Sequence, residues 1–109
     1  MKKIATVGEL RAYCESKKPR EIVFHTDNQR EYDLMKYPCS MVLHFPSMLV
    51  YENPNTIYLK AGRNVLTLNQ VKYVEIVSSK VIVGTTIIVH CHKMGVNEEE
   101  ENTYTLLIF

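Results

Sequence analysis

Residues 56–77 carry the stretch that decides the fold, TIYLKAGRNVLTLNQVKYVEIV. Apolar and polar residues alternate in three short segments, at 56–60, 65–68 and 71–77, as expected for half-buried strands. The two linkers between these segments are short and contain Gly and Asn, which favour turns. Strands joined by such short turns are antiparallel. The stretch therefore predicts a meander of three antiparallel strands.

Strand-forming residues also gather on both sides of this meander, at 22–25, 41–45, 48–51, 81–92 and 104–109. Pro46 predicts a break between two of these segments, because proline cannot donate a hydrogen bond to a strand ladder. Gly84 predicts a bulge or bend, which allows a small sheet to coil on itself. The chain after the first 20 residues is thus expected to be mostly antiparallel sheet.

The N-terminal segment has the pattern of a single helix. Thr6 followed three residues later by Glu9 matches the capping box, in which each side chain accepts a hydrogen bond from an unpaired backbone N–H. Lys17 and Lys18 complement the negative end of a helix dipole, and Pro19 cannot continue the helix. A helix over about 6–17 is predicted.

The length of 109 residues suits a single domain over residues 1–109. One helix followed by six to eight short strands predicts an α+β domain, with the N-terminal helix packed on a coiled antiparallel β-sheet or small open barrel. From the periodicity within each element, the expected core is Val7, Leu10, Cys14, Phe24, Leu43, Ile57, Leu66, Leu68, Ile76, Ile88 and Leu106.

The overall composition is that of an ordinary globular protein, with 46% hydrophobic residues and a net charge of +1. This charge gives no strong field toward nucleic acid or an anionic membrane. Three widely spaced cysteines fit neither a disulfide framework nor a paired metal motif, which favours a reducing cytoplasmic setting. The apolar run 81–89 is shorter than the ~20 residues of a membrane helix. A cytoplasmic protein without a membrane segment is expected.

Residues capable of catalysis or metal binding do not form a recognisable motif. His90 and His92 would lie on the same face of a strand, but structural zinc usually takes four ligands, so no metal site is predicted. The cysteines lie in apolar patterns typical of inert core positions, and the four glycines are isolated rather than gathered in a phosphate loop. We therefore expect no enzymatic activity, no catalytic residue and no cofactor.

An acidic run, Glu98, Glu99, Glu100 and Glu101, lies between two predicted strands. Four like charges repel one another and resist burial, so the run is expected to form an exposed loop. Two interpretations stay open at this point. The loop either improves solubility alone, or it contacts a basic groove on a partner.

Seven of the ten aromatic residues are tyrosines, which are common anchors of protein interfaces. A non-catalytic protein-binding module is therefore the leading functional hypothesis, and a homodimer is left open. The alternative is an Sm-like barrel that binds single-stranded nucleic acid. In that case Tyr58 and Tyr73 would stack on bases, and Arg63 and Lys72 would contact phosphates.

Three segments resemble small uncharacterised proteins of Firmicute phages and mobile elements: residues 7–10 (VGEL), 18–24 (KPREIVF) and 66–76 (LTLNQVKYVEI). Proteins of that setting include small anti-CRISPR inhibitors, which are typically compact and often non-enzymatic. The resemblance implies a protein partner such as a host defence nuclease. The near-neutral charge departs from the acidic pattern of DNA mimics, so ordinary surface binding is expected.

Overall fold

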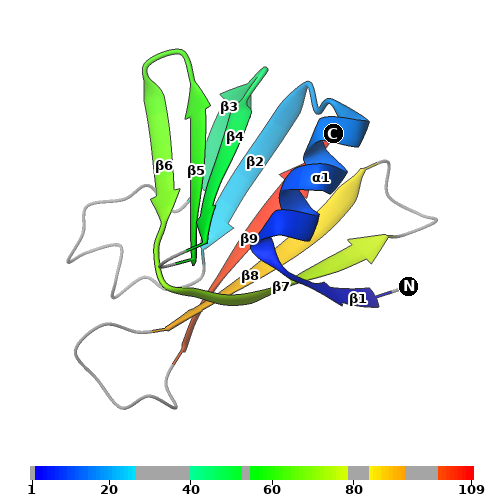
Figure 1. Cartoon of the computed structure of the whole chain (residues 1–109). Helices are drawn as coiled ribbons and strands as arrows, with labels where there is room; N and C mark the ends of the chain where they lie inside the picture. The colour runs from blue at the N-terminus through cyan, green and yellow to red at the C-terminus, as the bar shows by residue number, and fades with distance from the viewer. Residues whose placement is uncertain (1, 27–39, 53–54, 79–83, 93–100) are drawn as a thin grey trace.

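The computed structural model of the chain describes residues 2–26, 40–52, 55–78, 84–92 and 101–109. Within these ranges the chain forms one helix and nine strands (Figure 1), namely β1 Lys2–Ala5, α1 Val7–Lys17, β2 Glu21–Thr26, β3 Ser40–His44, β4 Ser47–Glu52, β5 Asn55–Ala61, β6 Asn64–Leu68, β7 Val71–Ser78, β8 Thr85–His92 and β9 Glu101–Ile108. The predicted class, an N-terminal helix with antiparallel strands, is confirmed.

The strands form two antiparallel sheets. One has six strands in the order β1-β7-β8-β9-β2-β3, and the other has three in the order β4-β5-β6. The two sheets are not joined into a closed barrel. Figure 1 shows α1 in front of β8 and β9 of the large sheet, with the three-stranded sheet at the left of the view. The meander expected from residues 56–77 is divided, because β5 and β6 belong to the small sheet and β7 to the large one.

The helix begins and ends where the sequence predicts. The Thr6 hydroxyl accepts a hydrogen bond from the Glu9 N–H at 3.2 Å, and the Glu9 carboxylate accepts one from the Thr6 N–H at 3.3 Å. The bond that the carboxylate accepts from the Thr6 N–H, together with the nearby Lys3 ammonium, holds the pKa of Glu9 below its usual value. At the other end, Lys18 adopts a left-handed conformation and its N–H donates to the Cys14 carbonyl oxygen at 2.9 Å.

A single hydrophobic core joins the helix to both sheets. The helix contributes Val7, Leu10 and Cys14, as predicted. The Tyr13 hydroxyl is hydrogen-bonded to the hydroxyl of Thr85 in β8, which ties the helix to the centre of the large sheet. The core therefore fixes α1 against β4 on one side and the large sheet on the other.

Two sequence predictions are wrong in detail. The described residues form nine strands instead of six to eight. The N-terminal strand β1 was not foreseen, because its pairing with β7 is distant in sequence and its first two residues are lysines. Ile88 was expected in the core, but Ile87, Val89 and Cys91 are the buried residues of β8. The run of consecutive apolar residues there has no alternation to reveal which face is buried.

Candidate functional site

The chain crosses from the large sheet to the small sheet at a two-residue corner. Because β3 ends at His44 and β4 begins at Ser47, the corner consists of Phe45 and Pro46. Phe45 has a φ of 48°, and its N–H donates to the Arg20 carbonyl oxygen at 2.8 Å. Its side chain is 79% exposed. A bulky residue rarely adopts a positive φ, so the corner holds an exposed aromatic ring on a strained backbone.

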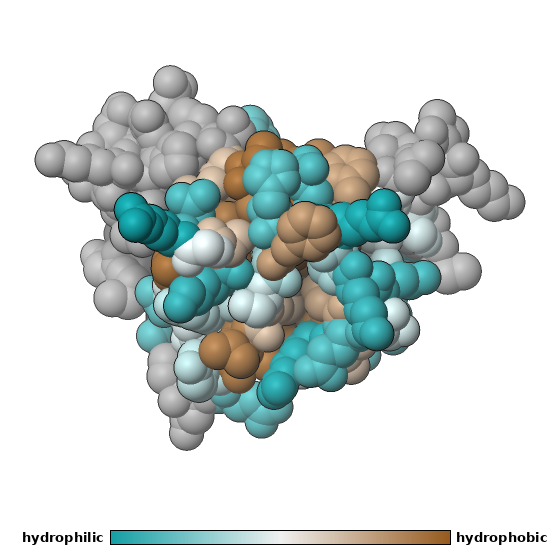
Figure 2. All heavy atoms as spheres, turned by 90° about the horizontal axis from the view of Figure 1, so that it is seen from above, coloured by the Kyte–Doolittle hydropathy of each residue, from teal (hydrophilic) through white to brown (hydrophobic). Residues whose placement is uncertain are grey.

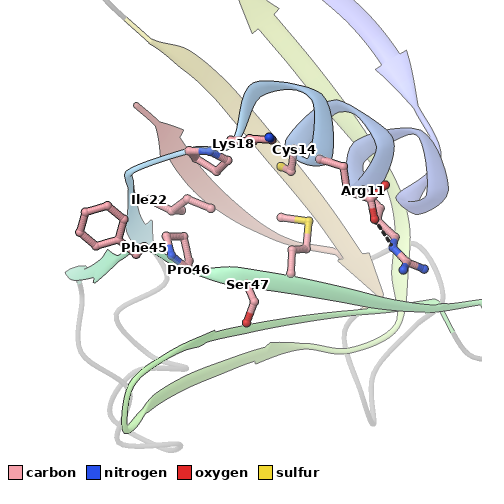
Figure 3. Close-up of a pocket in the computed structure, with 10 residues that line it drawn as sticks. Arg11, Cys14, Lys18, Ile22, Phe45, Pro46 and Ser47 are labelled. Atoms are coloured by element: carbon pink, nitrogen blue, oxygen red, sulfur yellow. Dashed lines mark hydrogen bonds and ion pairs between the residues drawn. The ribbon is translucent and has the colours of Figure 1, made fainter.

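A pocket of about 420 Å³ lies between the second half of α1 and this corner (Figure 3). Figure 3 shows Cys14 and Ile22 on the pocket side, with Phe45 at the outer edge. Such a volume is within the range of ordinary ligand-binding clefts. We call this site the corner pocket, and it is lined by Arg11, Cys14, Glu15, Lys18, Pro19, Ile22, Phe45, Pro46, Ser47 and Met48.

The corner pocket is lined by two basic side chains and one acidic side chain. Arg11 Nε lies 3.1 Å from Glu15 Oε1, so these two opposite charges form an ion pair one helical turn apart. Among the described residues, no acidic side chain forms an ion pair with the third charged residue, Lys18. The nearby Glu21 carboxylate lies 3.8 Å from His44 Nδ1. The pocket therefore keeps a net positive charge above an apolar floor.

Cys14 contributes to that floor as an apolar group. Burial raises the pKa of the Cys14 thiol from 9.0 to about 11. The thiol is therefore protonated at neutral pH, whereas a nucleophilic cysteine needs a lowered pKa. The thiol is suited to packing against an incoming apolar group.

The structure does not bring the two tyrosines of the nucleic-acid hypothesis together. Tyr58 lies in β5 opposite Leu49 and Thr67, on the face of the small sheet that points away from the core. Tyr73 lies in β7 and stacks on His90, with ring centroids 4.3 Å apart, on the outer face of the large sheet. Because the sheets share one core between their inner faces, these two outer faces point in different directions.

The other predicted contact residues are also dispersed. Arg63 is exposed in the turn between β5 and β6, and Lys72 is half-buried at an irregularity near the start of β7. Glu98, Glu99 and Glu100 lie outside the described residues, and Glu101 begins β9. The acidic-loop hypothesis therefore stays a prediction.

A polar cluster occupies the outer face of the large sheet. Glu75 is 7% exposed, and its Oε1 lies 3.1 Å from Lys2 Nζ and 3.6 Å from His90 Nε2. His92, two residues further along β8, is exposed. Within the part of the chain that the structure describes, no group of three His, Cys, Asp or Glu side chains is placed to hold a metal ion. The cluster is an ion-pair network attached to the sheet.

Sequence reasoning placed Phe45 at the end of a strand and did not identify the corner pocket. The available signal was an aromatic residue directly before a proline between two strands, since that dipeptide interrupts a ladder. The pocket itself depends on α1 lying against β4, a contact that no local pattern predicts.

Comparison with known proteins gave no match to a family model, to a curated protein or to a solved structure. In the described ranges, no helix combines the length and the apolar character that a membrane crossing requires. Functional argument for this chain therefore depends on the geometry of its own surface.

Proposed function

We propose that the protein is a small, non-catalytic binding module that contacts a protein partner through the corner pocket and the Phe45 ring. The observation that carries this proposal is the 79% exposure of Phe45 on a left-handed backbone at the edge of the pocket. An exposed aromatic ring beside an apolar cleft is the usual anatomy of an interface hot spot. Backbone strain also tends to gather at sites that bind.

The pocket chemistry supports binding better than catalysis. Its cysteine has a raised pKa, and its one acidic residue, Glu15, is paired with Arg11. Neither group is activated to transfer a proton or attack a substrate. Apart from Lys18 and Phe45, the remaining lining can bury a partner's apolar side chain, and it is formed by Pro19, Pro46, Ile22, Met48 and Ser47.

The nucleic-acid alternative is less well supported, because Tyr58 and Tyr73 lie on different outer faces and cannot form one stacking surface. Inhibition of a defence nuclease, the mobile-element origin and a homodimer stay predictions, to which the comparisons add nothing.

The test is selection of binders from a random peptide-display library on the immobilised protein. Each selected peptide is then measured against wild type, Phe45→Ser and Tyr51→Ser. Tyr51 is the matched control, because its aromatic side chain is 56% exposed in β4. We expect peptides whose affinity falls at least tenfold with Phe45→Ser and less than threefold with Tyr51→Ser. Failure to select any peptide, or equal effects of the two variants, would contradict the proposal.

A further inference from the structure

The side chains around the corner pocket carry an excess of positive charge. Arg11 and Lys18 line the pocket. Arg20 is joined to Phe45 by a backbone hydrogen bond, from the Phe45 N–H to the Arg20 carbonyl oxygen, and directly follows the pocket residue Pro19. We call Arg11, Lys18 and Arg20 the basic rim. Figure 2 views this end of the molecule from above and shows apolar side chains exposed among hydrophilic ones.

Acidic side chains near the basic rim do not neutralise it. The three cations of the basic rim outnumber the two neighbouring carboxylates, which are Glu21 and Glu15, the latter paired with Arg11 at 3.1 Å. No ion pair within the described residues involves Lys18, which lines the pocket together with Cys14, Ile22 and Met48. Electrostatic attraction between a partner and such a site is strengthened where the partner also excludes water.

We infer that the partner's contact segment is an acidic peptide carrying one large apolar side chain. This inference rests on the proposed function. The apolar side chain would enter the corner pocket, against Cys14, Ile22 and Met48, and pack beside the Phe45 ring. Flanking carboxylates would face the basic rim. A peptide with both features matches the site in shape and in charge. An uncharged apolar peptide matches the pocket in shape alone, and a basic peptide is repelled by the basic rim.

The arrangement favours a peptide over single-stranded nucleic acid. Binding to a single strand usually combines a cationic groove with several aromatic rings, on which successive bases stack. Phe45 is the one aromatic residue that lines the corner pocket among the described residues. A single ring beside an apolar cleft is suited to one inserted side chain.

The experiment uses fluorescence polarisation with three labelled nine-residue probes. The first has a central Phe flanked by four Glu, with Gly and Ser filling the remaining positions. In the second the Phe is replaced by Ala, and in the third every Glu is replaced by Lys. We expect the first probe to bind at least tenfold more tightly than either of the others. We also expect its affinity to fall as NaCl rises from 50 to 500 mM, because salt screens the exposed charges of the basic rim.

A matched pair of protein variants distinguishes a charge effect at the pocket from the effect of a changed net charge on the whole protein. Lys18→Glu and Lys17→Glu each reverse one charge at the C-terminal end of α1, but only Lys18 lines the pocket. The Lys17 ammonium lies over the Tyr13 ring, 5.9 Å from its centroid. We expect the affinity for the first probe to fall at least tenfold with Lys18→Glu and less than threefold with Lys17→Glu, with thermal unfolding showing both folded.

Each contrary result has a distinct meaning. Library peptides that depend on Phe45 but are not acidic would overturn this inference and leave the proposed function intact. Equal effects of Lys17→Glu and Lys18→Glu would overturn it as well, because the pocket would not be the site of charge recognition. Tighter binding of a labelled single-stranded oligonucleotide, lost with Phe45→Ser, would replace the peptide with nucleic acid. Absence of any Phe45-dependent binder would reject both proposals.

Discussion

Replacement of Phe45 offers a direct measurement of the strain at the sheet-to-sheet corner. The residue has a φ of 48° and lies 79% exposed, so its side chain contributes little burial while its backbone is unfavourable. Phe45→Gly removes the steric conflict between Cβ and the backbone, whereas Phe45→Ala retains it. Both variants remove the ring. Their difference in stability therefore isolates the backbone conformation.

The magnitudes follow from the geometry. A Phe side chain offers roughly 200 Å², of which about a fifth is buried here, so loss of the ring weakens folding by about 1 kcal/mol in both variants. Release of the left-handed strain stabilises Phe45→Gly by about 1–2 kcal/mol. The greater freedom of glycine in the unfolded chain removes about 0.5–1 kcal/mol of that gain. Phe45→Gly should thus be more stable than Phe45→Ala by up to about 1.5 kcal/mol, with a midpoint of about 0.8 kcal/mol.

The assay is urea unfolding followed by circular dichroism, with the same pair of substitutions at Val65 as the control. Val65 is 41% exposed in β6 and has no positive φ. There the order should reverse, since glycine in a strand is less stable than alanine by about 0.5–1 kcal/mol. If Phe45→Gly is also the less stable variant, the left-handed corner is refuted. Both Phe45 variants should lose binding to the acidic Phe probe, whatever their stability.

Three further predictions concern the framework that holds the corner pocket. Thr6→Ala should lower the free energy of unfolding by about 1 kcal/mol, because it removes the helix N-cap, and urea unfolding measures the loss. Gly84→Ala should lower the free energy of unfolding by roughly 2 kcal/mol in the same assay, because φ is 122° and a Cβ would lie 2.7 Å from the Ile108 carbonyl oxygen. The control Gly62→Ala, where φ is 61° and no atom lies within 4 Å of the added Cβ, should lower it by only about 1 kcal/mol. Burial raises the pKa of Cys14 from 9.0 to about 11, so between these pH values the thiol ionises in the unfolded chain but stays protonated in the folded one. The stabilising contribution of Cys14 is therefore complete below pH 9 and declines by up to about 2 kcal/mol toward pH 11. The difference in unfolding free energy between wild type and Cys14→Ala should narrow across that interval.

Local patterns predicted the elements more reliably than their assembly. The capping box of Thr6 and Glu9 fixes the helix start, because both partners lie within four residues of sequence. Strict alternation in β5 identified Ile57 as a core residue, which is fully buried. These features need no distant partner. Consecutive apolar residues in β8 carried no such signal, and Ile88 was assigned to the wrong face.

Local sequence patterns could not predict the corner pocket, and the reason is physical. The sequence shows that Pro46 interrupts a strand, but not that β3 and β4 then join different sheets. The division is set by long-range pairing, since β3 pairs with β2 and β4 pairs with β5. The residues of the nucleic-acid hypothesis lie apart in the structure for the same reason. Tyr58 and Tyr73 are close in sequence, yet the chain changes sheets between them.

The corner links the fold to the proposed binding function through a single backbone feature. A residue suited to stability alone at a φ of 48° would be Gly or Asn, which tolerate the left-handed region. Phe45 instead carries the strain and exposes its ring, while its N–H is held by the Arg20 carbonyl oxygen and the ring of Pro46 fixes φ at the following position. The ring is therefore positioned by the rigid junction of two sheets rather than by a long loop. Such an anchor loses little conformational freedom when a partner binds, so more of the contact energy remains available as affinity.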